Sequence, residues 1–316
     1  MLQSLLFALD ATLPIILIAV IGWGLRMRGF LTKEFLDVLN RLLYKIMLPL
    51  LLFRDVAAGR ITQDFDVRFA GYCFFSTIAY FAVIWLLSEL LIREKSIIGA
   101  FVQGSYRGSI ALLGVAFLDS IYGNSGQMPL AIVSAVPLYN IFAVVLLTVR
   151  GDNGAIDPKA LVRKCVKGIL TNPILLGVFG GLLFSLFEIE LPAVAAKTVN
   201  YFAVCCTPLA LLVIGAEFEG RKALRKIRPT VAASLIKLLV LPAVLLPVAV
   251  WMGFRGQDMV VLLVLAGSPA TATGYIMCKN LHGDYMLSSS IIMLTTALSA
   301  VTVTLLLFVL RSLALV

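Results

Sequence analysis

Apolar residues gather along this chain in ten long runs that short polar breaks separate. A helix rises about 1.5 Å per residue, so roughly 20 apolar residues cross the ~30 Å hydrocarbon layer of a bilayer. Membrane strands are excluded, because the runs do not alternate apolar and polar positions and an open sheet edge cannot face lipid. The pattern predicts an all-α polytopic membrane protein with ten transmembrane helices. They lie near residues 4–25, 35–57, 68–92, 97–118, 128–149, 168–187, 191–216, 230–253, 258–278 and 286–310.

Composition supports lipid as the natural solvent of this chain. Of its 316 residues, 61% are hydrophobic and 14% are charged, whereas a soluble domain carries about a quarter charged residues. The formal charge of +9 does not indicate a nucleic-acid partner, because the basic residues stand in short breaks and form no stripe. The five cysteines form no CxxC pair, so neither a disulfide framework nor a metal site is expected. The first run carries Asp10 and no basic residue before Arg26, so a retained helix is expected and not a cleavable signal.

The placement of lysine and arginine predicts the orientation in the membrane. Loops on one side hold sixteen of these residues, and loops on the other side hold six. Cytoplasmic loops carry the excess of basic residues. Both termini are therefore predicted outside, and the connection at 150–167 is predicted in the cytoplasm, with the protein in the cell (plasma or inner) membrane.

The central connection divides the predicted helices into two sets of five. We expect a first repeat over 1–150, a short cytoplasmic connection over 151–167 and a second repeat over 168–316. An odd number of helices in each half makes the second half enter the bilayer from the opposite face, which gives an inverted repeat. In each half the fourth run is polar and contains glycine: FVQGSYRGSIALLGVAF in the first, VLAGSPATATGYIMC in the second.

The first of these runs carries an arginine about halfway across the bilayer. A charge there costs about 2.5–3.5 kcal/mol on insertion scales, so Arg107 should face the interior of the bundle and have a partner. Glycines on both sides weaken the helix and let another backbone approach. The candidate substrate-binding residues here are Ser105, Tyr106, Arg107, Gly108 and Ser109.

The second run is interrupted by a proline. Pro269 lacks an amide donor and clashes with the preceding turn, so the helix should break there. Amides freed at a half-helix amino terminus attract anions, and freed carbonyls attract cations or hydroxyls. Two breaks at one depth, one of them with an arginine, predict a site for a small carboxylate. The candidates from this half are Ser268, Pro269, Thr271, Thr273 and Gly274, and Asn140 of the fifth run joins them.

Structural roles compete with these assignments. Arg107 can act as a pin that pairs with carbonyls of a neighbouring helix, and the small hydroxyl residues can be ordinary helix-packing positions. Asn140 can bridge two helices. Lys237, inside the eighth run, is expected to extend its amine towards the membrane surface. Glu217 and Glu219, at the start of a basic loop, are expected to be solvated.

At the two interrupted runs the sequence resembles the bacterial branch of the auxin efflux carrier family. The matching stretches are VQGSYRGSIALLGVAFLDSIYG and SPATATGYIMCKNLHGDYMLSSSIIMLTTALSAVTV. The resemblance implies two inverted five-helix repeats whose fourth and ninth helices are interrupted and cross at the midplane. It also implies transport of organic anions, which are auxin in the plant PIN-FORMED proteins and dicarboxylates such as malate or malonate in some bacterial members. The binding site would be Ser109 with its neighbours and Pro269 to Gly274. Ser109 and Ala116 replace an asparagine and a proline of the family pattern.

These observations predict a secondary transporter that moves a small organic anion by alternating access. The alternatives left open are a Na⁺-coupled symporter, an anion channel and a membrane scaffold or sensor without transport. An intramembrane enzyme is disfavoured, because the chain has one histidine and no deep acidic pair from which to build a catalytic set. No cofactor is expected, and the coupling ion is left open between H⁺ and Na⁺, with uniport as a third option. A homodimer is also left open.

Overall fold

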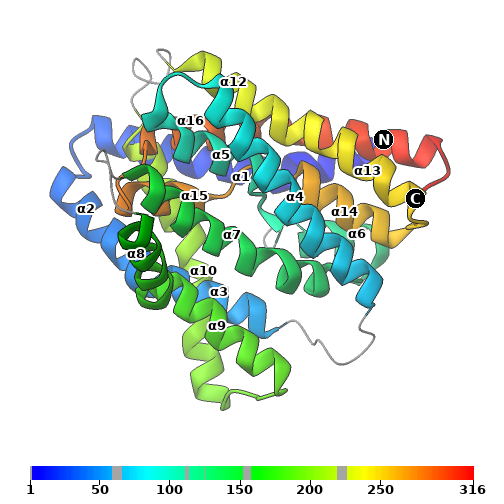
Figure 1. The fold of residues 1–316 in the computed structure, drawn as a ribbon, viewed down its shortest axis with the longest axis horizontal. Helices are drawn as coiled ribbons and strands as arrows, with labels where there is room; N and C mark the ends of the chain where they lie inside the picture. Colours follow the sequence, from blue (N-terminus) through cyan, green and yellow to red (C-terminus); the bar gives the residue numbers. More distant parts are fainter. Residues whose placement is uncertain (1, 59–65, 111–113, 125, 152–157, 219–225) are drawn as a thin grey trace.

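The computed structural model describes residues 2–58, 66–110, 114–124, 126–151, 158–218 and 226–316. Long helices lie side by side through the whole of this part (Figure 1). Within the described residues the only β-structure is a single bridge between Gly108 and Ala270. The expectation of an all-helical chain is confirmed.

The helices of the first half follow the predicted apolar runs. A π-helical turn, Leu43–Met47, joins α2 to α3 without interrupting the rod. The fourth run is divided between α5 and α6. The elements are α1 (Leu2–Met27), α2 (Lys33–Leu42), α3 (Leu48–Ala57), α4 (Val67–Leu91), a short 3₁₀ turn (Lys95–Ile97), α5 (Ile98–Tyr106), α6 (Val115–Tyr122) and α7 (Met128–Gly151).

The second half is built similarly. A second π-helical turn, Ile236–Val240, joins α12 to α13, and the ninth run is divided between α14 and α15. The elements are α8 (Pro158–Thr171), α9 (Pro173–Leu186), α10 (Ala193–Ala216), α12 (Ile227–Leu235), α13 (Leu241–Trp251), α14 (Gln257–Gly267), α15 (Ala272–Asn280) and α16 (Tyr285–Ser312).

One predicted helix differs from the structure. The sixth run was expected over 168–187 after a polar connection, but residues 158–171 form the separate helix α8, and the chain bends by 63° before α9. Asn172 causes the bend, because its side chain accepts hydrogen bonds from the amides of Ile174 and Leu175 and so starts a new helix. Pro173 follows at the first position of α9, where its missing amide costs nothing.

Several helices are suited to cross a bilayer. Within the described residues, five helical segments are long and apolar enough to span it, and the bent pair of α8 and α9 adds a sixth. The five are α4, α7, α10, the continuous α12–α13 segment and α16. The chain is therefore a multi-pass membrane protein. Ten spans in two inverted repeats stay a prediction.

The helices fall into two groups, and α1 of the first group packs against α16 of the second as well as against α10. We call α1, α2–α3, α9 and α10 the panel group, and α4 to α7 with α12 to α16 the crossing group. Glycines bring the panel helices together: a Cβ on Gly215 of α10 would overlap the Ala19 carbonyl of α1, and one on Gly177 of α9 would overlap the Pro49 carbonyl of α3. Such close approach is how helices associate where lipid removes the hydrophobic driving force.

Candidate functional site

The two interrupted helices meet at their breaks. α5 ends at Tyr106, and Arg107 continues in an extended conformation. α14 ends at Gly267, and Ser268 is likewise extended. The Ser109 amide donates a hydrogen bond of 2.9 Å to the Pro269 carbonyl, beside the bridge between Gly108 and Ala270. We call this pairing the crossing. It gives partners to backbone groups that lipid cannot satisfy.

Arg107 is buried at the crossing beside neutral partners. Its side chain is almost inaccessible, with the residue 3% exposed. Nη2 donates to Asn140 Oδ1 at 3.0 Å, and Nη1 contacts Met277 Sδ at 3.3 Å. Within the described part of the chain, Nε has no hydrogen-bond partner and no carboxylate forms an ion pair with Arg107. The guanidinium is therefore a buried charge without a counter-ion, an arrangement that favours an incoming anion.

Tyrosines and an asparagine fix the position of Arg107. Asn140 donates from Nδ2 to the Val136 carbonyl at 2.8 Å, which turns its oxygen towards the guanidinium. The Tyr106 hydroxyl donates to the Tyr139 carbonyl at 3.0 Å. The hydroxyls of Tyr139 and Tyr80 lie 2.9 Å apart. These contacts hold α5 against α4 and α7, so the end of α5 is a rigid support.

A cavity of about 500 Å³ lies between the crossing and the panel group. Its volume falls within the range of small-molecule sites. The crossing supplies one wall, and α1, α3 and α10 supply the other. Among the predicted binding residues, the lining includes Arg107, Gly108, Ser109, Pro269, Thr271 and Thr273.

The other predicted residues support the crossing from outside this lining. Ser105 donates to the Phe101 carbonyl within its own helix at 2.8 Å, and Tyr106 and Asn140 make the contacts described above. Ser268 is buried, and within the described residues its Oγ has no hydrogen-bond partner. Gly274 is buried in the first turn of α15.

The amino terminus of α15 opens into the cavity. Thr271 caps the helix, with its hydroxyl accepting from the Thr273 amide at 3.1 Å. The Ala270 amide is not part of this cap and donates to Thr295 Oγ1 of α16 at 3.1 Å. Thr271, Ala272 and Thr273 all line the cavity, so the positive end of the helix dipole faces the space where an anion would sit.

Two charged residues of the lining were not predicted as site residues. Arg54 and Asp55 stand near the end of α3, and Arg54 donates to Asp55 Oδ1 from Nε at 3.0 Å and from Nη2 at 2.8 Å. Arg54 also donates to Asn200 Oδ1 of α10 at 3.0 Å. The sequence signal was an acid and a base side by side within an apolar run, but Arg54 was counted only as one of the six basic residues on the outer side of the membrane.

Lys237 does not extend to the membrane surface, so that expectation was wrong. The residue is fully buried. Its Nζ donates to the Ala266 carbonyl at 2.7 Å and to the Leu265 carbonyl at 3.2 Å. Carbonyl acceptors at the end of α14 replace water as the partners of the ammonium.

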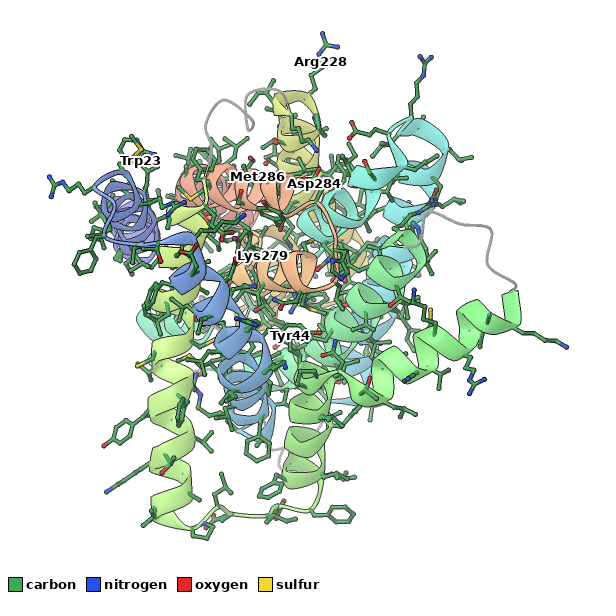
Figure 2. The ribbon with its side chains drawn as sticks, turned by 90° about the vertical axis from the view of Figure 1, so that its left-hand side faces the viewer. Trp23, Tyr44, Arg228, Lys279, Asp284 and Met286 are labelled. Carbon is green, nitrogen blue, oxygen red and sulfur yellow. The ribbon has the colours of Figure 1, made fainter. Side chains whose placement is uncertain are left out.

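Glu217 is not solvated either, because it joins the two helix groups. It binds the Tyr275 hydroxyl and the Lys279 ammonium of α15, and Lys279 also lies 3.2 Å from Asp37 of α2. Figure 2 shows Lys279 near the middle of the view, among the helices. We call these four residues the Glu217 cluster. Glu219 lies outside the described residues.

Replacing Lys279 with glutamine should loosen the contact between the groups. The carboxylates of Glu217 and Asp37 would lose their shared cation, and the Glu217 side chain is only 14% exposed. A partly buried pair of this kind contributes about 1 kcal/mol or somewhat more, so the thermal unfolding midpoint should fall by a few degrees. Lys33→Gln, at an exposed position of α2, is the matched control. Equal midpoints for both variants would contradict the role of the cluster.

Broken helices whose polar breaks meet at a cavity inside an apolar bundle are the architecture of a membrane transporter. The chain belongs to the membrane transport protein family, whose sequence profile matches residues 7–307. The resemblance to auxin efflux carriers is thereby confirmed. Because the family and the relatives are transporters, the expectation that the chain is not an enzyme is confirmed as well.

Curated relatives cover nearly the whole chain. A protein of Rhizobium meliloti that carries the name "Putative malonate transporter" is 26% identical over 306 residues, which are 92% of this chain and 94% of the relative. An uncharacterized transporter of Methanocaldococcus jannaschii is 24% identical over 314 residues, 94% of this chain and 97% of the relative. An uncharacterized transporter of Methanothermobacter thermautotrophicus is 22% identical over 301 residues, 93% and 95% of the two chains.

Proposed function

We propose that this protein moves a small carboxylate across the membrane by alternating access. The observation that carries the proposal is the buried guanidinium of Arg107, which has neutral partners and lines the cavity at the crossing. A buried cation without a counter-ion is stabilised by a bound anion. The name of the Rhizobium meliloti relative favours a dicarboxylate, with malonate as the first compound to test.

The cavity lining suggests how the carboxylate would be held. One carboxylate group would be attracted by Arg107 and by the amino terminus of α15. The hydroxyls of Ser109, Thr271 and Thr273 would donate hydrogen bonds. Ser105, Tyr106, Asn140, Ser268 and Gly274 would keep the crossing in shape and act on the substrate only through it. Pro269 would contribute by preventing the helix from closing over the site.

The two helix groups suggest the moving parts. In the proposed topology, ten spans form inverted repeats over 1–150 and 168–316, with 151–167 in the cytoplasm and both termini outside the cell membrane. The Glu217 cluster would then close the cytoplasmic end of the contact between the groups. The crossing group would move against the panel group, whose glycine contacts favour a rigid unit. Breaking the Glu217 cluster would expose the site to the opposite side.

Malonate should stabilise the purified protein against heat. A ligand that binds only the folded state stabilises it by about 2.7 kcal/mol at one hundred times its dissociation constant, so the unfolding midpoint should rise saturably by several degrees. Dimethyl malonate, with the same carbon skeleton but no charge, should have no such effect. Stabilisation by the neutral diester or by organic cations alone would overturn the assignment of an anion.

A further inference from the structure

The end of α14 leaves two carbonyl groups without helical donors. In an uninterrupted helix the Leu265 carbonyl would accept from residue 269 and the Ala266 carbonyl from residue 270. Residue 269 is a proline, which has no N–H. The Ala270 amide donates to Thr295 Oγ1 of α16 instead. Buried carbonyls in this position need another partner.

Lys237 is that partner. Its Nζ lies 2.7 Å from the Ala266 carbonyl and 3.2 Å from the Leu265 carbonyl, and the residue is fully buried. It belongs to the π-helical turn Ile236–Val240, a kind of turn that is frequent at functional positions. Within the described residues no carboxylate pairs with Lys237. The ammonium is therefore held by carbonyl oxygens and by the negative end of the α14 dipole.

Ser268 and Gly108 complete the surroundings of the ammonium. A Cβ on Gly108 would overlap Ser268 Oγ and lie 2.9 Å from Lys237 Nζ and 3.3 Å from the Leu265 carbonyl oxygen. The Ser268 hydroxyl is buried and has no partner among the described residues. Two carbonyls at the end of a broken helix with a hydroxyl nearby are the oxygen ligands that transporters use for Na⁺.

We propose that Lys237 is a tethered cation, which occupies from within the chain the position that a coupling Na⁺ would take at the end of α14. Its Nζ donates to both freed carbonyls, so the crossing forms without Na⁺ and transport needs no Na⁺ gradient. This inference rests on the proposed transport function. It assigns Lys237 as a positioning residue, which acts on the substrate through the crossing.

Removing the ammonium should create a site for the ion that it replaces. In Lys237→Ser the carbonyls and the space remain, and the new hydroxyl adds an oxygen. The thermal midpoint of this variant should be lower than that of the wild type in choline chloride and should rise saturably when NaCl replaces choline at constant ionic strength. Lys237→Met fills the space with an apolar chain of similar length, so it should be destabilised without a response to Na⁺.

The first π-helical turn provides a matched control. Lys45 stands in the turn Leu43–Met47 but is exposed, so Lys45→Ser should leave the midpoint equal in NaCl and choline chloride. The wild type should also be insensitive to the exchange. Two results would overturn the proposal that Lys237 is a tethered cation. One is a saturable stabilisation of the wild type by Na⁺, and the other is a folded Lys237→Ser variant that does not respond to Na⁺.

Two further results separate a failure of this inference from misfolding of the variants and from a failure of the proposed substrate. If neither Lys237 variant folds, malonate uptake by wild-type proteoliposomes with and without an imposed Na⁺ gradient decides: equal rates support the inference, and faster uptake along the gradient rejects it. The protein could also bind no malonate while Na⁺ stabilises Lys237→Ser and not Lys237→Met. In that case the proposed substrate is wrong, and the proposal that Lys237 replaces Na⁺ is supported.

Discussion

Arg107→Gln should weaken malonate binding strongly while the protein stays folded. Glutamine keeps an amide that can donate to Asn140 Oδ1, which accepts from Arg107 at 3.0 Å, but it removes the positive charge. Loss of one partner from a buried, hydrogen-bonded charge pair costs about 2–5 kcal/mol, so the dissociation constant should rise by about 30-fold or more. Isothermal titration calorimetry of the purified variant measures this directly.

The stability of the unliganded variant separates a binding role from a structural one. Arg107 has no carboxylate partner within the described residues, so removing its charge should leave the unfolding midpoint unchanged or slightly higher. A structural pin would instead lower the midpoint. Arg228→Gln is the control, because Arg228 projects from the edge of the bundle (Figure 2). Full malonate affinity in Arg107→Gln would remove the basis of the proposed function.

The second large effect is expected from Gly108→Ala. The new methyl group would overlap Ser268 Oγ and approach Lys237 Nζ to 2.9 Å, where both neighbours are buried. Overpacking of this kind costs about 1–3 kcal/mol, and relief would require the side chains of Ser268 and Lys237 to leave their present positions at the crossing. We expect a midpoint lower by several degrees and loss of malonate uptake in proteoliposomes.

Gly71→Ala tests whether the loss of stability and uptake expected for Gly108→Ala is specific to the crossing. Gly71 lies in α4, and a Cβ there would meet no atom within 4 Å. Alanine in a helix is favoured over glycine by about 0.5–1 kcal/mol, so this variant should be as stable as the wild type or more so, with full uptake. Similar losses in both variants would show that the helices tolerate no added methyl group, and the crossing would have no special role.

The sequence predicted the helices well because length and apolarity decide them. The breaks at Arg107 and Pro269 were also predicted, since a mid-membrane charge and a proline are local signals. The bend at Asn172 was missed although Asn followed by Pro is a local signal for the start of a helix, because the basic residues before it were interpreted as a loop and not as the helix α8.

The candidate site was predicted in part, and the misses share a cause. The residues at the breaks were predicted correctly as candidates, because the glycines, the proline and the charge that interrupt a helix also leave polar groups available to bind a ligand. Lys237 and Glu217 were misassigned because their partners, Ala266 and Lys279, are distant in sequence. Nothing in the local pattern shows whether a lysine reaches water or a carbonyl on another helix. Asp55 was missed because its only signal was an adjacent arginine.

The π-helical turn at Ile236–Val240 has a consequence for the register of the eighth run. An α-helix advances about 100° per residue, so an extra residue would rotate the whole of α13 by that angle if the π-helical turn did not accommodate it. The rotation would carry Leu241, Leu246 and Ala249, which are now buried, towards lipid and bring exposed positions inward. The wide turn therefore keeps the buried face of α13 in register with α12, and it places Lys237 where its Nζ reaches the carbonyls at the end of α14.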